Sequence, residues 1–270
     1  MKKNKNNGMI TQDPNVNDLL FKELIKRGYS LEGNTRVWNI ADSKLWYLTP
    51  EQAQAYLDWE NSYEIKEKGP SQVEKSLVHG MIKHRMAELT EGPLNIIDLG
   101  CGDGKKAMEI IKMIGNKTSI KYCPIDISGY MVKKAIANFT KLNVGELVLG
   151  LQYNISDFEN LENLIPLLSA EGGRKNLFLM LGGTLGNFEV DELLYAVRSA
   201  MNKGDFFLAS IGVKGSKWEV WAEKQKHDKR MDKFFGLIPI KLGLGVDEVE
   251  FGSRFKNSRV EYYYKLLKDK

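Results

Sequence analysis

The stretch Asn95-Ile-Ile-Asp-Leu-Gly-Cys-Gly-Asp-Gly104 decides the fold class of this chain. Its segment 95–99 is typical of a buried strand, and three glycines spaced by one residue follow directly. An amphipathic helical pattern then covers residues 105–114. Glycines let the backbone approach a ligand closely, and a helix N-terminus carries partial positive charge. The stretch therefore predicts a cofactor-binding strand–loop–helix unit, with a tight turn that binds nothing as the alternative.

Strand-like and helix-like segments alternate after residue 94. Strands are expected at residues 95–99, 120–125, 147–152, 176–181 and 205–212, with helices at 105–114, 129–140, 157–169 and 189–202. This alternation predicts an α/β fold with a doubly wound, Rossmann-like parallel sheet. A further helix is expected at residues 217–235. Residues 248–255 and 259–267 are expected to form an antiparallel hairpin that completes a seven-stranded sheet.

The first 92 residues show no convincing strand pattern. Helices are expected at residues 17–27, from Thr49-Pro50 onward and at residues 71–89. The second of them starts at Thr49-Pro50 because Thr before Pro is a typical helix start. The third helix carries an apolar side made of Val73, Leu77, Val78, Met81, Ile82 and Met86. We therefore expect an N-terminal helical extension at residues 1–92 that caps the substrate, and a cofactor-binding domain at residues 93–270.

Composition limits the classes of partner. The 270-residue chain has a net charge of +4, much of it in the first seven residues, and its body contains no concentrated basic run of the kind that strong nucleic-acid binders carry. His79, His84 and His227 are scattered, and the chain has only two cysteines, so neither a metal site nor a disulfide framework is expected. With no signal peptide and no long apolar run visible, we expect a cytoplasmic protein without a membrane partner.

Acidic residues follow the second and third expected strands of the sheet. In doubly wound sheets ligands lie across the carboxyl ends of the strands. Asp126 is therefore placed to accept hydrogen bonds from ribose hydroxyls, although it could instead cap the next helix. Asp157 is placed to accept from an adenine amine beside an apolar wall at Phe158, although it could instead cap the following helix. Asp98, inside the first strand, is expected to brace the amides of the glycine loop.

Four segments of the chain resemble one family. The glycine loop has the D-x-G-x-G-x-G form used by enzymes that bind S-adenosylmethionine, as class I methyltransferases do. Four other segments resemble motifs of the histidine-specific methyltransferases of ergothioneine biosynthesis. They are Leu181-Gly-Gly-Thr-Leu-Gly-Asn-Phe188, Tyr122-Cys-Pro-Ile-Asp-Ile-Ser128, the Asp157-Phe158 pair and Leu45-Trp-Tyr-Leu-Thr-Pro-Glu51. Enzymes that methylate base amines carry an Asn/Asp-Pro-Pro-aromatic run after the fourth strand, and this chain has none.

The resemblance implies S-adenosylmethionine-dependent methylation of the amine of a small acceptor, an amino acid or a derivative. It implies catalytic roles for Tyr47 and Asn187 at the acceptor amine. It implies a cofactor site made of Gly100, Cys101, Gly102, Gly104, Lys106, Asp126, Ile127, Asp157, Phe158 and Gly182.

The chain also departs from the family that it resembles. Family enzymes continue past the last strands with an acid and a serine that read the imidazole ring, whereas this chain ends at Lys270. We therefore expect the acceptor-reading segment to be absent or rebuilt, with histidine still open as an acceptor. An RNA or protein methyltransferase and a non-catalytic cofactor-binding relative are the other hypotheses. The oligomeric state does not follow from the sequence.

Overall fold

The computed structural model describes residues 25, 28, 30–39, 43–64, 70–148, 151–152, 161, 173–212, 229–245, 247–256 and 259–267. The contacts between Cα atoms divide the chain into one unit of residues 1–41 and 235–270 and a second unit of residues 42–234. The expected substrate cap at residues 1–92 stays a prediction. Residues 217–228 of the helix expected at 217–235, and nearly all of the helices expected at 157–169 and 17–27, lie outside the described residues.

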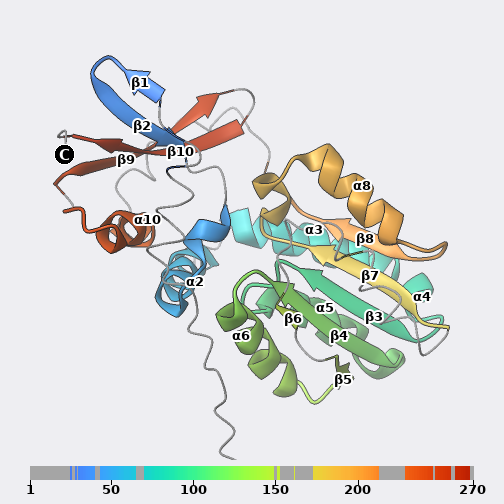
Figure 1. Ribbon diagram of the computed structural model, residues 1–270. Helices are drawn as coiled ribbons and strands as arrows, with labels where there is room; N and C mark the ends of the chain where they lie inside the picture. Colours follow the sequence, from blue (N-terminus) through green and yellow to red (C-terminus); the bar gives the residue numbers. More distant parts are fainter. Residues whose placement is uncertain are drawn as a thin grey trace, which may run out of the picture. The chain divides into compact units, whose positions relative to one another are not determined.

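A parallel sheet forms the centre of the unit of residues 42–234 (Figure 1). Its strands run in the order β5 (Glu146–Leu147), β4 (Ile120–Asp126), β3 (Leu94–Leu99), β7 (Lys175–Met180) and β8 (Phe206–Ala209). A short strand, β6 (Leu151–Gln152), pairs with the carboxyl end of β4. All of these pairings are parallel, which confirms the predicted α/β class and its parallel sheet.

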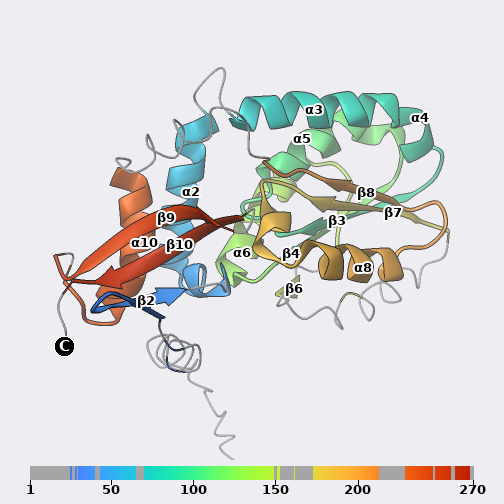
Figure 2. The same cartoon turned by 90° about the horizontal axis from the view of Figure 1, so that it is seen from above.

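Helices cover both faces of this sheet. The helical elements of this unit are η1 (Ser43–Trp46), α2 (Pro50–Glu64), α3 (Pro70–His84), α4 (Met86–Leu89), α5 (Lys105–Ile114), η2 (Gly115–Lys117), α6 (Gly129–Thr140), η3 (Thr184–Asn187) and α8 (Val190–Ala200), and α10 spans Lys229–Lys241. Ile96 and Tyr122 pack in one core cluster with α3, α5 and α6, whereas Ile97 and Cys123 pack in another with α8. Figure 2 shows α3 and α5 on the side of the sheet opposite α8. Neighbouring residues of each strand therefore serve opposite faces, as the twofold period of a strand requires.

The amino ends of three strands are joined by a polar relay. The Asn95 side-chain amide donates to Asn176 at 2.9 Å, and the Asn176 side-chain amide donates to Asp205 at 2.9 Å. Asn95 and Asn176 are each only 1% exposed. Because buried polar groups are costly unless they are hydrogen-bonded, the relay favours the observed alignment of β3 and β7 over a shifted one.

A second sheet corrects two expectations. Strands β1 (Ser30–Glu32), β2 (Thr35–Asn39), β10 (Arg259–Leu266) and β9 (Val249–Lys256) form an antiparallel sheet in the order β1–β2–β10–β9. The expectation of no strand in the first 92 residues is therefore wrong. The carboxyl-terminal hairpin forms as predicted, but it pairs with β2, so a single seven-stranded sheet is not confirmed.

Candidate functional site

The three glycines after β3 have different structural roles. A Cβ atom at Gly100 would lie 2.6 Å from the Thr184 side chain, and one at Gly104 would lie 2.9 Å from Cβ of Ala135. These two glycines therefore allow the loop to pack against η3 and α6. Gly102 has a φ of +53°, and a Cβ atom there would meet nothing within 4 Å. Only the middle glycine of the loop thus borders open space, as a position approached by a ligand should.

Asp126 holds this loop in place from the end of β4. Its carboxylate accepts hydrogen bonds from the amide of Gly102 at 3.0 Å and from the amide of Ser128 at 2.9 Å. Burial raises the pKa of Asp126 to about 6, although these amide hydrogen bonds act in the opposite direction. The side chain is therefore ionised at neutral pH. The Ile127 amide is a third donor to this carboxylate. A carboxylate has about four acceptor positions, so three amide donors leave capacity for a hydroxyl donor of a ligand.

Asp98 does not brace the loop, contrary to expectation. Its described hydrogen bond comes from the Tyr122 hydroxyl at 2.8 Å, across the pair β3 and β4. Burial raises the pKa of Asp98 to about 7, even though the bond from Tyr122 lowers it. The sequence suggested bracing by an acid near the loop, and the structure assigns that contact to Asp126 instead, because Asp98 points into the core shared with Tyr122.

Three charged side chains converge beside the loop from three helices. The amino group of Lys106, in the first turn of α5, lies 3.0 Å from Oε1 of Glu60 and 3.1 Å from Oε2 of Glu74. Oε1 of Glu74 also accepts from the Gly182 amide at 2.7 Å and from the Ser210 hydroxyl. Of these residues, the sequence pointed to Lys106 and Gly182 as cofactor residues and missed Glu60, Glu74 and Ser210.

An aromatic cluster covers one side of α2. The rings of Tyr47, Tyr56 and Trp59 all contact the ring of Phe234, with centroids 5.6–6.2 Å apart. A capping box orients this helix, because Thr49 and Gln52 each donate a backbone amide to the other's side chain. Burial raises the pKa of Tyr56 well above its ordinary value, and the charges of Glu60 and Asp126 add to this effect. The cluster therefore lies near the carboxylate expected to hold the ribose.

The positions of the remaining predicted site residues say less about what they bind. Asn187 ends η3 and is exposed, and Ile127 is partly exposed directly after β4. Cys101 is buried, and burial raises the pKa of its thiol well above the ordinary value, so it stays protonated. Asp157 and Phe158 lie outside the described residues. Sequence reasoning missed Tyr56, Trp59 and Phe234 as site residues. The sequence carried a signal for Tyr56 alone, which is one helical turn before Glu60.

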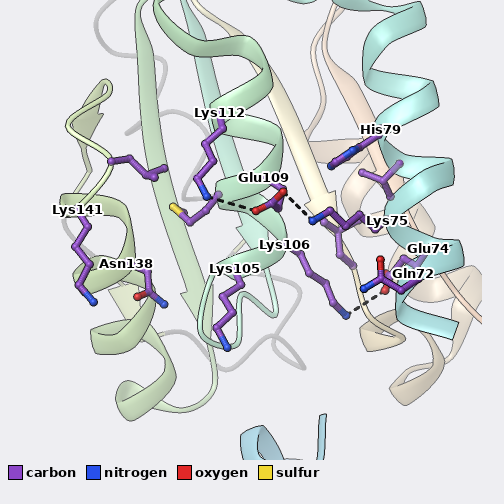
Figure 3. Close-up of a pocket in the computed structure, with 14 residues that line it drawn as sticks. Gln72, Glu74, Lys75, His79, Lys105, Lys106, Glu109, Lys112, Asn138 and Lys141 are labelled. Carbon is purple, nitrogen blue, oxygen red and sulfur yellow. Dashed lines mark hydrogen bonds and ion pairs between the residues drawn. The ribbon is translucent and has the colours of Figure 1, made fainter. Parts of the chain in front are cut away.

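A pocket of about 550 Å³ opens between α3, α5 and α6 (Figure 3). Figure 3 shows Glu109 pairing with Lys75 and Lys112 at its centre, and Glu74 pairing with Lys106 at one end. The glycine loop and Asp126 do not line it. The pocket therefore touches the predicted cofactor site only through Glu74 and Lys106.

Metal-binding clusters and membrane-spanning helices are both absent from the described part of the chain. No group of three or more His, Cys, Asp or Glu residues within it could hold a metal ion. Nor is any helix there both long enough and apolar enough to cross a membrane.

Comparison with solved structures finds methyltransferases. The plantazolicin methyltransferase BpumL in complex with S-adenosylhomocysteine is 12% identical, with 93% of this chain and 98% of that chain covered and a TM-score of 0.47. The carbon methyltransferase CurJ is 15% identical, with 82% and 62% covered and a TM-score of 0.46. An O-methyltransferase family protein from Burkholderia thailandensis is 14% identical, with 92% and 82% covered and a TM-score of 0.38. A comparison with curated proteins finds no significant match.

The family itself is shown by the sequence. Residues 57–238 match the model of the family described as histidine-specific methyltransferase, SAM-dependent. This match contains the glycine loop, Asp126, Lys106 and the strand-end segment at Gly182. The open space at Gly102 and the ionised carboxylate of Asp126 suit the nucleoside of such a cofactor. The chain belongs to the family of histidine-specific, S-adenosylmethionine-dependent methyltransferases, and it is a methyltransferase that uses S-adenosylmethionine.

Proposed function

We propose that this methyltransferase acts on the amine nitrogen of a small cationic acceptor, an amino acid or an amino-acid derivative. The observation that carries the proposal is the aromatic cluster of Tyr47, Tyr56, Trp59 and Phe234. Aromatic faces attract an ammonium group through cation–π interactions. An amine that gains methyl groups keeps or gains positive charge, so the same surroundings suit substrate and product.

The cofactor is held, in this proposal, by the residues that the family resemblance indicated. The loop of Gly100, Cys101, Gly102 and Gly104 approaches its nucleoside, and Asp126 accepts from the ribose hydroxyls. Ile127 and Gly182 add contacts beside them. Asp157 and Phe158 hold the adenine, and Lys106 faces the carboxylate of its methionine part. When bound, the cofactor supplies a methyl group already activated on a sulfonium.

The chain itself supplies alignment and a suitable environment. Asn187 holds the amine and carboxylate end of the acceptor, and Tyr47 closes over the same group from the helical region. The ammonium form has no lone pair, so the acceptor must first lose one proton to water. Its nitrogen then forms a bond to the methyl carbon as the bond from that carbon to sulfur breaks, and these residues direct the lone pair at the methyl group. Alignment of this kind can contribute about 7–11 kcal/mol to lowering the barrier.

A substrate panel tests this proposal. Purified protein and S-adenosylmethionine are incubated with each free amino acid, histidine included, and separately with total RNA and with a mixture of peptides. Formation of S-adenosylhomocysteine and methylated product is followed by mass spectrometry. We expect turnover with an amino acid or a derivative. Methylation of RNA or peptides alone would overturn the proposal.

Two variants then test the assigned residues on the acceptor found. Tyr47→Phe and Asn187→Ala are expected to lower kcat/KM about tenfold or more, because each loses a polar contact to the acceptor. The affinity for S-adenosylhomocysteine should stay within about twofold. Tyr195→Phe on α8 is the matched control, since this tyrosine is 76% exposed. Equal effects of Tyr47→Phe and Tyr195→Phe would remove Tyr47 from the acceptor site.

A further inference from the structure

Glu60, Glu74 and Lys106 form a charge cluster that no sequence motif predicts. They come from α2, α3 and α5, three helices that are separate along the chain. The side chains are partly buried, with 24%, 18% and 29% of their surfaces exposed. Long charged side chains are seldom ordered in this way at a surface, because holding them costs conformational entropy. The convergence therefore indicates a built site.

The cluster is fixed to the carboxyl ends of β7 and β8. Glu74 is held by the Gly182 amide, which follows β7, and by the Ser210 hydroxyl, which follows β8. Gly182 has a φ of +76°, and a Cβ atom there would overlap the amino group of Lys106. Only a glycine lets the lysine reach this position. The cluster thus lies at the edge of the sheet where the ligand of a doubly wound fold binds.

The cluster carries more negative than positive charge. Burial tends to raise the pKa of Glu74, but the Lys106 charge and the bonds from Ser210 and Gly182 outweigh it and lower the pKa below its ordinary value. Burial tends to lower the pKa of Lys106, but Glu60 and Glu74 outweigh it and raise that pKa. One cation therefore faces two acidic side chains. A single carboxylate would neutralise the lysine, so the second leaves a place for another cation.

The amino-acid end of the cofactor has the complementary charges. Its carboxylate is anionic, and its α-ammonium and sulfonium are cationic, which gives one net positive charge. We propose that Glu60 and Glu74 together receive the α-ammonium group of S-adenosylmethionine, next to Lys106, which receives the carboxylate. The inference rests on the cofactor position given in the proposed function. It adds two acidic residues as determinants of cofactor recognition.

Oxygen atoms are available for this contact. Lys106 donates its hydrogen bond to Oε1 of Glu60, and within the described residues no bond is made by Oε2 of Glu60. An ammonium group has three donors and can bridge two carboxylates. Hydrogen bonds between charged partners are roughly twice as strong as those between neutral ones. The two glutamates should therefore matter for ligands that carry the ammonium group and not for ligands that lack it.

The first experiment uses the unmodified protein and three ligands. Calorimetric titration compares S-adenosylhomocysteine, its deamino analogue and 5′-methylthioadenosine, which lacks the whole amino-acid end. We expect the deamino analogue to bind at least about tenfold more weakly than S-adenosylhomocysteine. Binding of the two within about threefold of each other would overturn the proposal without any variant. No acceptor is present, so this result is independent of the proposed amine substrate.

The second experiment assigns the contact to residues. Glu60→Gln and Glu74→Gln are each expected to weaken S-adenosylhomocysteine about tenfold and to leave its deamino analogue within about twofold. Equal losses with both ligands would mean that the glutamates only position Lys106, and no loss would mean that they do not contact the ligand; both results overturn the proposal. Unchanged binding of 5′-methylthioadenosine verifies the fold of each variant. Glu109→Gln is the matched control, because Glu109 pairs with Lys75 and Lys112 outside the cluster.

Discussion

The ionisation of Asp126 should set the pH dependence of cofactor affinity. Burial gives this carboxyl a pKa of about 6 in the free protein. About nine tenths of it is therefore ionised at pH 7 and only about one tenth at pH 5. Its oxygens already accept from the amides of Gly102, Ser128 and Ile127, so only the ionised form keeps an acceptor position for a ribose hydroxyl. The dissociation constant should then rise about tenfold between pH 7 and pH 5 and level off above pH 7.

Calorimetric titration with 5′-methylthioadenosine from pH 5 to pH 8 measures this effect, because that ligand keeps the ribose and lacks the titratable amino-acid end. Asp126→Asn should bind about 10- to 100-fold more weakly at pH 7 and should lose the pH dependence, since the amide does not ionise. Asp191→Asn, at an exposed position of α8, is the control. A flat profile in the unmodified protein, or tighter binding at low pH, would refute the assignment of Asp126 to the ribose.

The other predictions concern the loop and the core beneath it. Gly104→Ala should cost about 2–4 kcal/mol of unfolding free energy, because its Cβ would overlap α6 at a φ of +77°, and chemical denaturation measures this. Gly102→Ala should cost only about 1–2 kcal/mol but abolish cofactor binding by calorimetry, because its Cβ enters open space; similar affinity in the unmodified protein and this variant would contradict the role. Tyr122→Phe should cost about 1–3 kcal/mol, because the buried Asp98 carboxyl loses its described donor. Burial raises the pKa of Asp98 from 3.8 to about 7, so folding favours its protonated form and stability falls as pH rises from about 4 to 7. The free energy of unfolding is measured against pH for the unmodified protein and for Asp98→Asn. Between pH 4 and pH 7 the unmodified protein should lose about 4 kcal/mol more than the variant, and parallel profiles would contradict this prediction.

The elements of the parallel sheet were predictable because their patterns are local. Helices α5 and α6 begin and end at the residues that their apolar periodicity and flanking glycines indicated. Most strands agree within a few residues, although the segment expected at 147–152 contains two separate short strands. The second sheet was missed because β1 and β2 are short and depend on β10, more than 200 residues away in the chain.

Helix α3 shows a different limit of pattern reading. All its apolar residues were assigned to one side, yet Val73, Leu77 and Met81 are more than half exposed. Val78 and Ile82 are the ones buried in the core. The helix has two apolar stripes, and only the position of the sheet decides which one is covered.

Some residues of the candidate site could likewise be predicted from the sequence, and others could not. Gly102 and Asp126 could be found because both follow strands, where doubly wound folds bind ligands. The meeting of Glu60 and Glu74 with Lys106 could not, since it depends on the packing of three helices. The sequence also could not distinguish the packing glycines, Gly100 and Gly104, from the one beside open space.

The polar relay of Asn95, Asn176 and Asp205 has a consequence for how this fold can change during evolution. It aligns β3, β7 and β8 at the edge of the sheet opposite the candidate site. Alignment of the strands therefore does not depend on the loops that follow Leu99, Met180 and Ala209. Substitutions or insertions in those loops can alter what the protein binds while the strands stay in register. A family built this way can acquire new methyl acceptors without first having to find a new fold.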